Sequence, residues 1–230
     1  MGLSIAMKIN FPLLALAVGA FAIGTTEFSP MGFLPEIAND LSVSIPQAGL
    51  LISAYAVGVM IGAPLMTLWL ARFPKKTALI LLMAIFTIGN VLATVAPDYM
   101  SLMGARLITS LNHGAFFGLG SVVAASVVPK DKQASAVAMM FMGLTIANIG
   151  GVPLATWLSQ NTSWRMAFAA ISILGIMTML ALWKALPQDH DVVKPNVAKG
   201  LRVLTRAPVV LALLCTRQIS QNPYPIRILP

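Results

Sequence analysis

Charged side chains are scarce in this chain of 230 residues. Only 10% of the residues are Asp, Glu, Lys or Arg, whereas soluble globular domains carry about 25%. The deficit excludes a disordered chain, and it argues against nucleic-acid binding although the net charge is +8. Cysteine is nearly absent too. With Cys215 as the sole thiol, the sequence has no internal disulfide and no cysteine-based metal site.

The motifs of common enzymes are also missing. The sequence contains no Gly-x-x-x-x-Gly-Lys-Ser/Thr phosphate loop, no His-Glu-x-x-His pair and no Gly-x-Ser-x-Gly turn. With two histidines and seven acidic residues, a catalytic site would have to rely on Glu27, His113 and hydroxyl groups alone. We therefore predict that the protein is not an enzyme and that it binds no cofactor or metal. We also expect any energy it uses to come from an ion gradient.

Long apolar stretches are what the sequence has in abundance. Hydrophobic residues make up 58% of the chain, and a membrane-crossing helix needs about 20 predominantly apolar residues. Six stretches free of charged residues are long enough, at 9–26, 41–71, 77–97, 107–129, 133–164 and 166–183. They predict an all-α membrane protein with a six-helix bundle in residues 1–186. A cleaved signal peptide is the alternative for the first stretch, but five further spans follow it.

The basic residues predict the orientation of these spans. Most of the 15 Lys and Arg residues precede the first span or follow the second, fourth and sixth, whereas the opposite loops hold only Arg165. Positively charged loops remain on the cytoplasmic side. We therefore predict that the amino terminus and residues 187–206 are cytoplasmic. Topology and lipid contact explain the positive charge better than binding to a polyanion.

A short internal repeat predicts how the spans are organised. The second span contains Gly-Ala-Pro-Leu-Met-Thr at 62–67 and the fifth contains Gly-Val-Pro-Leu-Ala-Thr at 151–156. The two spans hold matching places in two three-helix units and run in opposite directions. This pattern is typical of the 3+3 inverted repeat of many secondary transporters. A chance match is the alternative, because Gly and Pro recur in membrane spans.

Glu27 is the first charged residue inside a predicted span. Residues 9–34 form one long apolar segment that Pro30 is expected to kink, and Glu27 lies within it. A charged group at the membrane centre costs about 2.5–3.5 kcal/mol on insertion scales, so we expect Glu27 to face a cavity or to carry a proton. The alternative is that the span ends at Phe28 and that Glu27 lies among the lipid headgroups.

Arg106 is the second such residue. Helical spacing places it on one face with several polar or small residues, a face suited to the interior of a bundle. The residues on this face are Arg106, Ser110, His113, Gly114 and Phe117. His113 is either a proton carrier or a hydrogen-bonded packing residue. If Glu27 and Arg106 share a cavity, protonation of Glu27 would change its attraction to Arg106 or to a solute and so favour one of two conformations.

The sequence around Glu27 and Arg106 resembles motifs of the major facilitator superfamily. The resemblance is to the bacterial drug/proton antiporter branch, which includes arabinose-efflux-permease-like proteins. The resemblance covers roughly residues 8–215. Residues 24–41, which include Glu27, are similar to the first-helix signature. Residues 106–114 resemble the fourth-helix motif, which ends here in Asn112, His113 and Gly114. The resemblance implies that Arg106 takes part in proton coupling.

The fifth span and one loop carry further parts of the resemblance. Residues 143–153 are similar to the antiporter motif, whose Gly143, Gly151 and Pro153 would allow close packing and help to gate the pathway. In the loop after the second span, the matching residues are Gly62, Arg72, Lys75 and Lys76. Ala71 and Pro74 replace the usual Asp and Gly, which weakens the case for a charge-relay gate. The loop cations are either anchors of a cytoplasmic gate or simple topological charge.

The resemblance implies a function, and it also implies that the chain corresponds to one half of a larger fold. It predicts half of a twelve-helix fold, with residues 187–230 forming a cytoplasmic linker and the truncated start of a seventh span. It further implies proton-coupled efflux of a small sugar-like or drug-like solute across the bacterial inner membrane. The expected pathway residues are Glu27, Arg106, Asn112, His113 and Asn148. The alternative is a non-transporting truncated protein, or a half-transporter that needs a second copy or a carboxy-terminal half.

Overall fold

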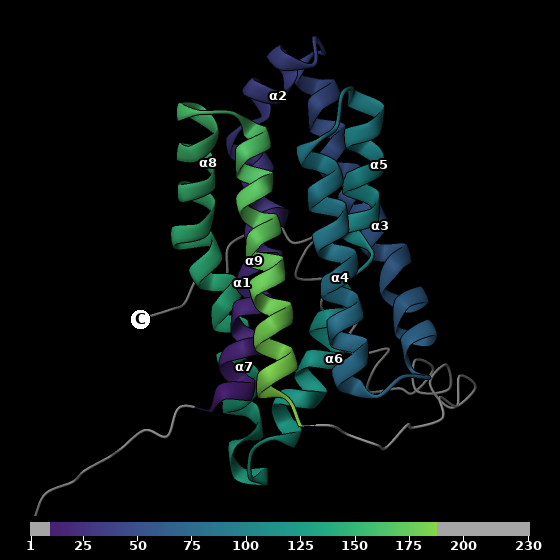
Figure 1. Ribbon diagram of the computed structural model, residues 1–230, viewed down its shortest axis with the longest axis vertical. Helices are drawn as coiled ribbons and strands as arrows, with labels where there is room; N and C mark the ends of the chain where they lie inside the picture. Colours follow the sequence, from purple (N-terminus) through teal and green to yellow (C-terminus); the bar gives the residue numbers. More distant parts are fainter. Residues whose placement is uncertain (1–9, 188–230) are drawn as a thin grey trace, which may run out of the picture. The chain divides into compact units, whose positions relative to one another are not determined.

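The computed structural model describes residues 10–187, and all of their regular structure is helical (Figure 1). The predictions for residues 187–230 therefore fall almost wholly outside the described residues. The elements, in chain order, are α1 (Phe11–Gly32), α2 (Leu34–Asp40), α3 (Ile45–Leu70), α4 (Lys75–Thr94), α5 (Tyr99–Ser110), α6 (His113–Ser126), the 3₁₀ turn η1 (Lys130–Lys132), α7 (Gln133–Ile146), the π-helical turn η2 (Ala147–Gly151), α8 (Val152–Asn161) and α9 (Trp164–Ala185).

Six helical spans among the described residues are long and apolar enough to cross a membrane. They are α1, α3, α4, α5 with α6, the stretch from η1 to α8, and α9. The predicted all-α, six-span fold is therefore confirmed. The first helix continues past Glu27 to Gly32, as expected from residues 9–34 forming one long segment and against the alternative end at Phe28. The fourth span begins at Tyr99 and so includes Arg106, which lies just before the charge-free stretch 107–129.

Side-chain caps explain where several helices begin. Ser44 and Gln47 form a capping box at the start of α3, in which the Gln47 amide nitrogen donates to Ser44 Oγ at 3.3 Å. Asp98 and Ser101 form another at the start of α5, with the Ser101 amide 2.9 Å from Asp98 Oδ1. Each cap satisfies main-chain groups that the first helical turn leaves unpaired. The short links between spans are thus set by sequence as well as by packing.

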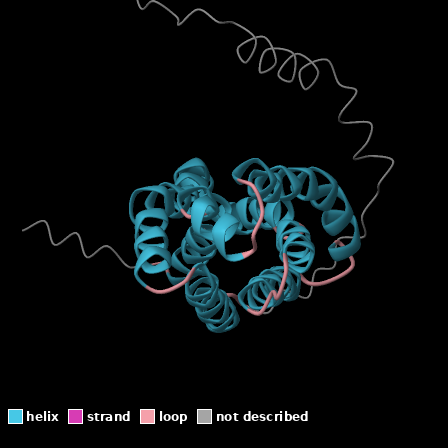
Figure 2. Ribbon diagram, turned by 90° about the horizontal axis from the view of Figure 1, so that it is seen from above, coloured by secondary structure: helices cyan, strands magenta, loops and turns pink. Residues whose placement is uncertain are grey.

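Successive spans run in opposite directions (Figure 1). The start of α1, the α3–α4 link, the α6–α7 link and the end of α9 lie at one end, which we call the basic end. The other end, which carries α2, also holds the α4–α5 and α8–α9 links. Spans α3 and α7–α8, which contain the two copies of the six-residue repeat, are antiparallel, as a 3+3 inverted repeat requires. Figure 2 shows the same bundle viewed along its helices.

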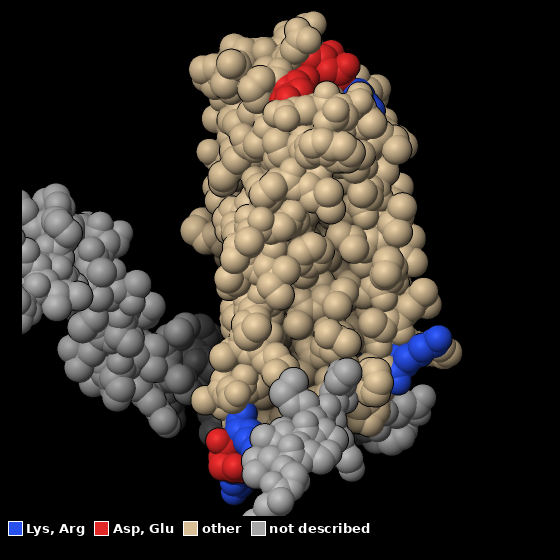
Figure 3. Space-filling view, turned by 90° about the vertical axis from the view of Figure 1, so that its left-hand side faces the viewer, with Lys and Arg blue, Asp and Glu red and all other residues tan. Residues whose placement is uncertain are grey.

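Charge is confined to the two ends on the face shown in Figure 3. Asp131 is the one described acid at the basic end. The described cations there are Arg72, Lys75, Lys76, Lys130, Lys132 and Lys184. At the α2 end the described charged residues are Glu36, Asp40, Asp98 and Arg165. This asymmetry fits the predicted orientation, which remains a prediction.

Helix α1 packs against many of the other helices. It contacts α7, α9, η2 and α8 along its length, and α4 packs closely against α9. By contrast, spans α3 and α7–α8 are mostly exposed: in each, only 22% of the most apolar 18-residue stretch is buried. These two spans therefore present most of their apolar surface outward, where lipid or a further helical bundle can cover it.

Candidate functional site

Three spans bring ionisable and hydroxyl side chains together around Glu27 of α1. Its Oε2 atom lies 3.8 Å from Nδ1 of His113, the first residue of α6. The hydroxyl of Tyr55 from α3 is 3.2 Å from the same nitrogen. The Glu27 side chain keeps 26% of its surface exposed and His113 keeps 15%. Glu27 is therefore partly accessible and not sealed in the core.

Arg106 lies deeper, with 1% of its surface exposed. Its Nη1 nitrogen donates to the main-chain oxygen of Thr26 at 2.9 Å, and its guanidinium carbon lies 4.3 Å from the centre of the Tyr55 ring. Its Nε and Nη2 atoms are buried without a hydrogen-bond partner in the described part of the chain. A buried, half-satisfied guanidinium is costly, which makes it a candidate functional group.

Thr26 connects this cluster to α4. Its hydroxyl donates to Oδ1 of Asn90 at 2.6 Å, and the Asn90 amide nitrogen donates to the Phe86 carbonyl at 2.9 Å. Thr26 and Asn90 are both fully buried. Neither Asn90 nor Tyr55 was among the predicted site residues. An uncharged amide within an apolar run and a tyrosine in mid-span were the available signals.

The fourth span breaks between α5 and α6, beside the predicted pathway residues. Leu111 and Asn112 form a turn there, and Asn112 is fully buried with both side-chain amide atoms lacking a partner among residues 10–187. The close approach of α3 explains why Gly62 is needed. A Cβ atom at Gly62 would lie 2.7 Å from Cα of Leu111. Gly62, which was predicted to serve gating or helix packing, thus lies against the break in the fourth span.

The fifth span is interrupted by the π-helical turn η2. Pro153 follows it and lacks the amide hydrogen that a regular helix would donate to the carbonyl four residues earlier, which favours such a widened turn. Asn148 lies in η2, is exposed, and donates to the Leu144 carbonyl at 3.0 Å. It does not reach Glu27 through any described contact.

Two glycines allow this interrupted span to pack on α1. A Cβ at Gly143 would lie 2.0 Å from the Ala17 carbonyl oxygen, and a Cβ at Gly151 would lie 2.3 Å from Thr25 Oγ1. Contacts this short exclude any side chain without movement of the helices. Both positions, predicted to serve gating or packing, therefore lie at the α1 interface.

The predicted loop cations lie at the basic end, away from Glu27. Arg72 Nε donates to the Trp69 carbonyl at 2.8 Å, and Lys76 Nζ donates to the Leu186 carbonyl at 2.7 Å. Lys75 is the first residue of α4. Lys76 thus fastens the end of α9 to the start of α4. No motif in the sequence indicates that contact.

An aromatic row leads outward from the Glu27 cluster. His113 and Phe117 of α6 have ring centres 5.1 Å apart, and Phe117 stacks on Phe141 of α7 at 5.1 Å with an interplanar angle of 15°. Phe141 is 39% exposed. The row therefore joins the buried polar cluster to an accessible apolar surface. No group of three or more His, Cys, Asp or Glu residues within 10–187 could hold a metal ion.

The family model for the Major Facilitator Superfamily matches residues 16–223. The chain belongs to this superfamily. A relative named inner membrane transport protein YdhP, from Escherichia coli (strain K12), is 67% identical over 210 residues, which are 91% of this chain and 54% of that protein. A probable sugar efflux transporter of Pasteurella multocida (strain Pm70) is 31% identical over 208 residues, covering 90% and 51%. The chain spans about half the length of the curated relatives it matches.

Solved structures show the same fold. The crystal structure of peptide transporter POT in complex with sulfate superposes with a TM-score of 0.69 over 94% of this chain and 47% of that one. Sequence identity is 13%. The predicted membership of this superfamily and the amino-terminal-half placement are confirmed.

Proposed function

We propose that this chain supplies the amino-terminal half of a proton-coupled transporter that exports a small solute across the bacterial inner membrane. One observation carries the proposal: the Glu27 carboxylate lies 3.8 Å from His113 in a partly accessible cluster that also holds the buried Arg106. An ionisable trio inside a membrane bundle is costly, and such groups commonly mark proton or substrate pathways.

Protonation of Glu27 is the coupling step in this proposal. A neutral Glu27 loses its attraction to His113 when the imidazole is charged and to the Arg106 guanidinium. Arg106 already binds the main chain of Thr26, the residue before Glu27. A change of charge at Glu27 therefore acts on the same turn of α1 that Arg106 holds. Two positions of this turn, favoured by the two protonation states, would convert a proton gradient into movement.

The solute would contact the aromatic row next to Glu27. Phe141 offers an accessible ring face, and Glu27 and His113 offer hydrogen-bonding groups nearby. Such a surface suits a sugar-like or drug-like molecule with one flat apolar face and a few polar groups. The name of the Pasteurella relative, a probable sugar efflux transporter, supports solute export, and the YdhP name supports the inner membrane. The transporter names of both relatives support a role other than catalysis.

Alternating access in this superfamily fold requires a second bundle. The relatives are about twice as long as the matched region, and the outward apolar faces of α3 and α7–α8 are available for such a partner. The partner is either a second copy of this chain or a carboxy-terminal half. In either arrangement we propose that the basic end faces the cytoplasm.

Transport in vesicles tests the proposal. The chain, alone or coexpressed with the carboxy-terminal half of the E. coli relative, is reconstituted with a pH-sensitive dye inside. Addition of a pentose or of ethidium across an imposed pH gradient should cause proton counterflow. Glu27→Gln should abolish this flow, whereas Asp131→Asn, an exposed acid in η1, should leave it unchanged. Undiminished, pH-coupled flow in Glu27→Gln would reject the role of Glu27.

A further inference from the structure

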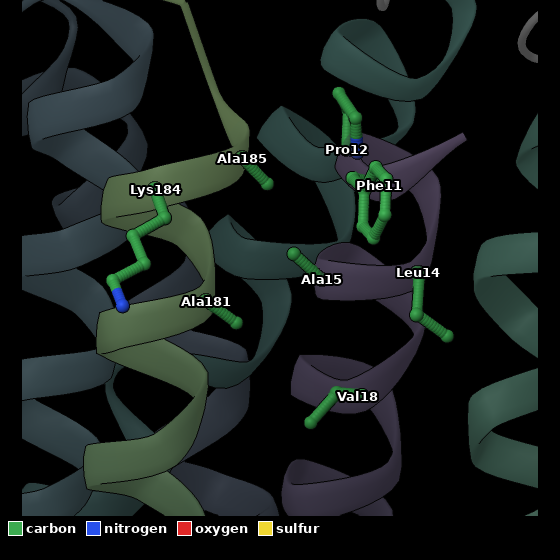
Figure 4. Close-up of a pocket in the computed structure, with 8 residues that line it drawn as sticks. All are labelled: Phe11, Pro12, Leu14, Ala15, Val18, Ala181, Lys184 and Ala185. Atoms are coloured by element: carbon green, nitrogen blue, oxygen red, sulfur yellow. The ribbon is translucent and has the colours of Figure 1, made fainter. Parts of the chain in front are cut away.

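An apolar groove of about 520 Å³ separates the start of α1 from the end of α9 at the basic end (Figure 4). Three alanines give it its depth. Ala181 and Ala185 of α9 project toward α1, where Ala15 lies opposite them (Figure 4). Larger side chains of α1, including Phe11, Leu14 and Val18, form its wall. The groove has the size of a typical small-molecule site.

The groove is held open by contacts at both helix ends. Asn10 caps α1 through the Leu13 amide, and its Nδ2 atom donates to the Val127 carbonyl at 3.3 Å. Lys76 holds Leu186, the residue after α9, by the 2.7 Å hydrogen bond already described. Because neither wall is a frayed helix end, the groove exists without a ligand and needs little ordering when one binds.

The wall of the groove faces outward. Phe11 is 66% exposed and Leu14 is 50% exposed. Both residues lie in a helix apolar enough to cross a membrane. This exposed apolar surface is therefore expected to face the lipid hydrocarbon near one edge of the bilayer.

One cation lies at the rim. Lys184 is exposed, is one of the residues that line the groove, and makes no hydrogen bond or ion pair with any of residues 10–187. Its side chain runs along α9 on the side away from Ala15 (Figure 4). The described acid in the basic-end links, Asp131, lies in η1. A lysine side chain is long and flexible, so rotation about its side-chain bonds would lay its stem along the apolar surface and bring its ammonium group to the headgroup region.

We propose that this groove binds one acyl chain of an anionic phospholipid, whose phosphate contacts Lys184. The apolar wall and alanine floor accept the chain, and the ammonium group, which has no partner among residues 10–187, binds the negative headgroup. Charge complementarity favours this occupant over a helix from a second copy, because an apolar helix would leave Lys184 unpaired at the interface. Basic pockets between membrane helices on the cytoplasmic side are known sites for acidic lipids. The proposal does not depend on transport.

Native mass spectrometry of the purified full chain in detergent tests it. The chain is titrated with phosphatidylglycerol or with phosphatidylcholine of the same acyl composition. We expect at least one bound phosphatidylglycerol, with an affinity about five-fold above that of phosphatidylcholine, the change that about 1 kcal/mol per lysine near an anionic surface implies. Lys184→Gln should reduce phosphatidylglycerol binding to the phosphatidylcholine level. Lys130→Gln, which removes an exposed lysine outside the groove, should keep the preference.

A second variant tests the contribution of the apolar groove separately from that of the Lys184 charge. Ala181→Leu fills the floor and should weaken binding of both lipids, while thermal unfolding in detergent shows whether the bundle is intact. Equal affinity of the wild-type chain for the two lipids would overturn the proposal, and so would a preference that survives Lys184→Gln. It would also fail if crosslinking from a photoreactive residue at Ala181 captured residues 188–230 or a second copy instead of lipid.

Discussion

Arg106 binds the main-chain oxygen of Thr26, at 2.9 Å, and leaves the neighbouring Glu27 carboxylate to His113. Two of its guanidinium nitrogens are thereby buried without an acceptor among the described residues. In the proposed cycle, these nitrogens are available to the Glu27 carboxylate in a second conformation of α1. Among the described residues no hydrogen bond or ion pair joins Arg106 to Glu27, so the attraction predicted between them acts at a distance in this conformation.

Tyr55 makes two contacts in this cluster, and two variants should measure the contribution of each to stability separately. Tyr55→Phe removes the hydroxyl that meets His113 at 3.2 Å but keeps the ring 4.3 Å from the Arg106 guanidinium carbon. It should destabilise the bundle by about 1 kcal/mol. Tyr55→Leu also removes the cation–π contact, adding about 2 kcal/mol at a desolvated site. Chemical unfolding in detergent measures both, and equal losses would show that the ring contact contributes nothing.

Asn90 should matter to stability although no motif marks it. Asn90→Ala leaves the buried Thr26 hydroxyl without its 2.6 Å acceptor, and an unsatisfied buried group costs about 1–3 kcal/mol. The same substitution at Asn161, an exposed residue whose side chain donates to the Trp157 carbonyl, should cost less than half as much. Thermal unfolding of the two variants side by side tests this. Equal unfolding midpoints would show that the hydrogen bond between Thr26 and Asn90 does not stabilise the bundle.

Gly143 and Gly150 offer a matched pair in the same span. Gly143→Ala places a methyl group 2.0 Å from the Ala17 carbonyl oxygen, which must push α7 away from α1 and cost about 1–3 kcal/mol. Gly150→Ala meets nothing within 4 Å and should be neutral or slightly stabilising. The unfolding midpoint of the first variant should fall by several degrees, at about 2–4 °C per kcal/mol for a chain of this size. A fall in the Gly150 variant alone would contradict the packing described.

Asp40 should make the α2 end sensitive to acid. It is hydrogen-bonded by Arg165 and by Nε1 of Trp164, and the Arg165 contact is the main reason that its pKa lies below the ordinary value. A lowered pKa means that the stabilisation is fully present above about pH 4, the unfolded pKa of aspartate, and is lost as pH falls through the lower folded value.

Asp40→Asn therefore tests the acid sensitivity. Because the pair is partly exposed, its contribution should not exceed about 1 kcal/mol. The variant should be less stable than the parent chain at pH 7 and equal to it well below pH 4. Unfolding curves across this range measure the difference, and a gap that widened on acidification would have the wrong sign.

The sequence was sufficient to predict the spans, because hydrocarbon excludes charge and the links between spans collect it. It was also sufficient to single out Glu27 and Arg106, since a charge inside an apolar run is conspicuous. Tyr55 and Asn90 carry no charge, so a search for charged residues inside apolar stretches does not find them. Their importance comes from long-range contacts, such as that between Thr26 and Asn90, 64 residues apart.

The two helix interruptions were harder to predict. The turn at Leu111 and Asn112 contains neither Gly nor Pro, and a single Asn inside an apolar span is a weak signal for a break. The π turn η2 depends on Pro153, which by itself is equally compatible with a simple kink. Pro64, at the matching place in the repeat, lies inside the continuous helix α3. Packing around each site decides which outcome a proline produces.

The π turn also divides the packing of its span. Toward the basic end, α7 packs on α1 at Gly143, and toward the α2 end α8 packs against both α1 and α9. The wide turn at residues 147–151 therefore lets the two pieces follow different directions and meet different neighbours, which one straight rod through the bilayer could not do.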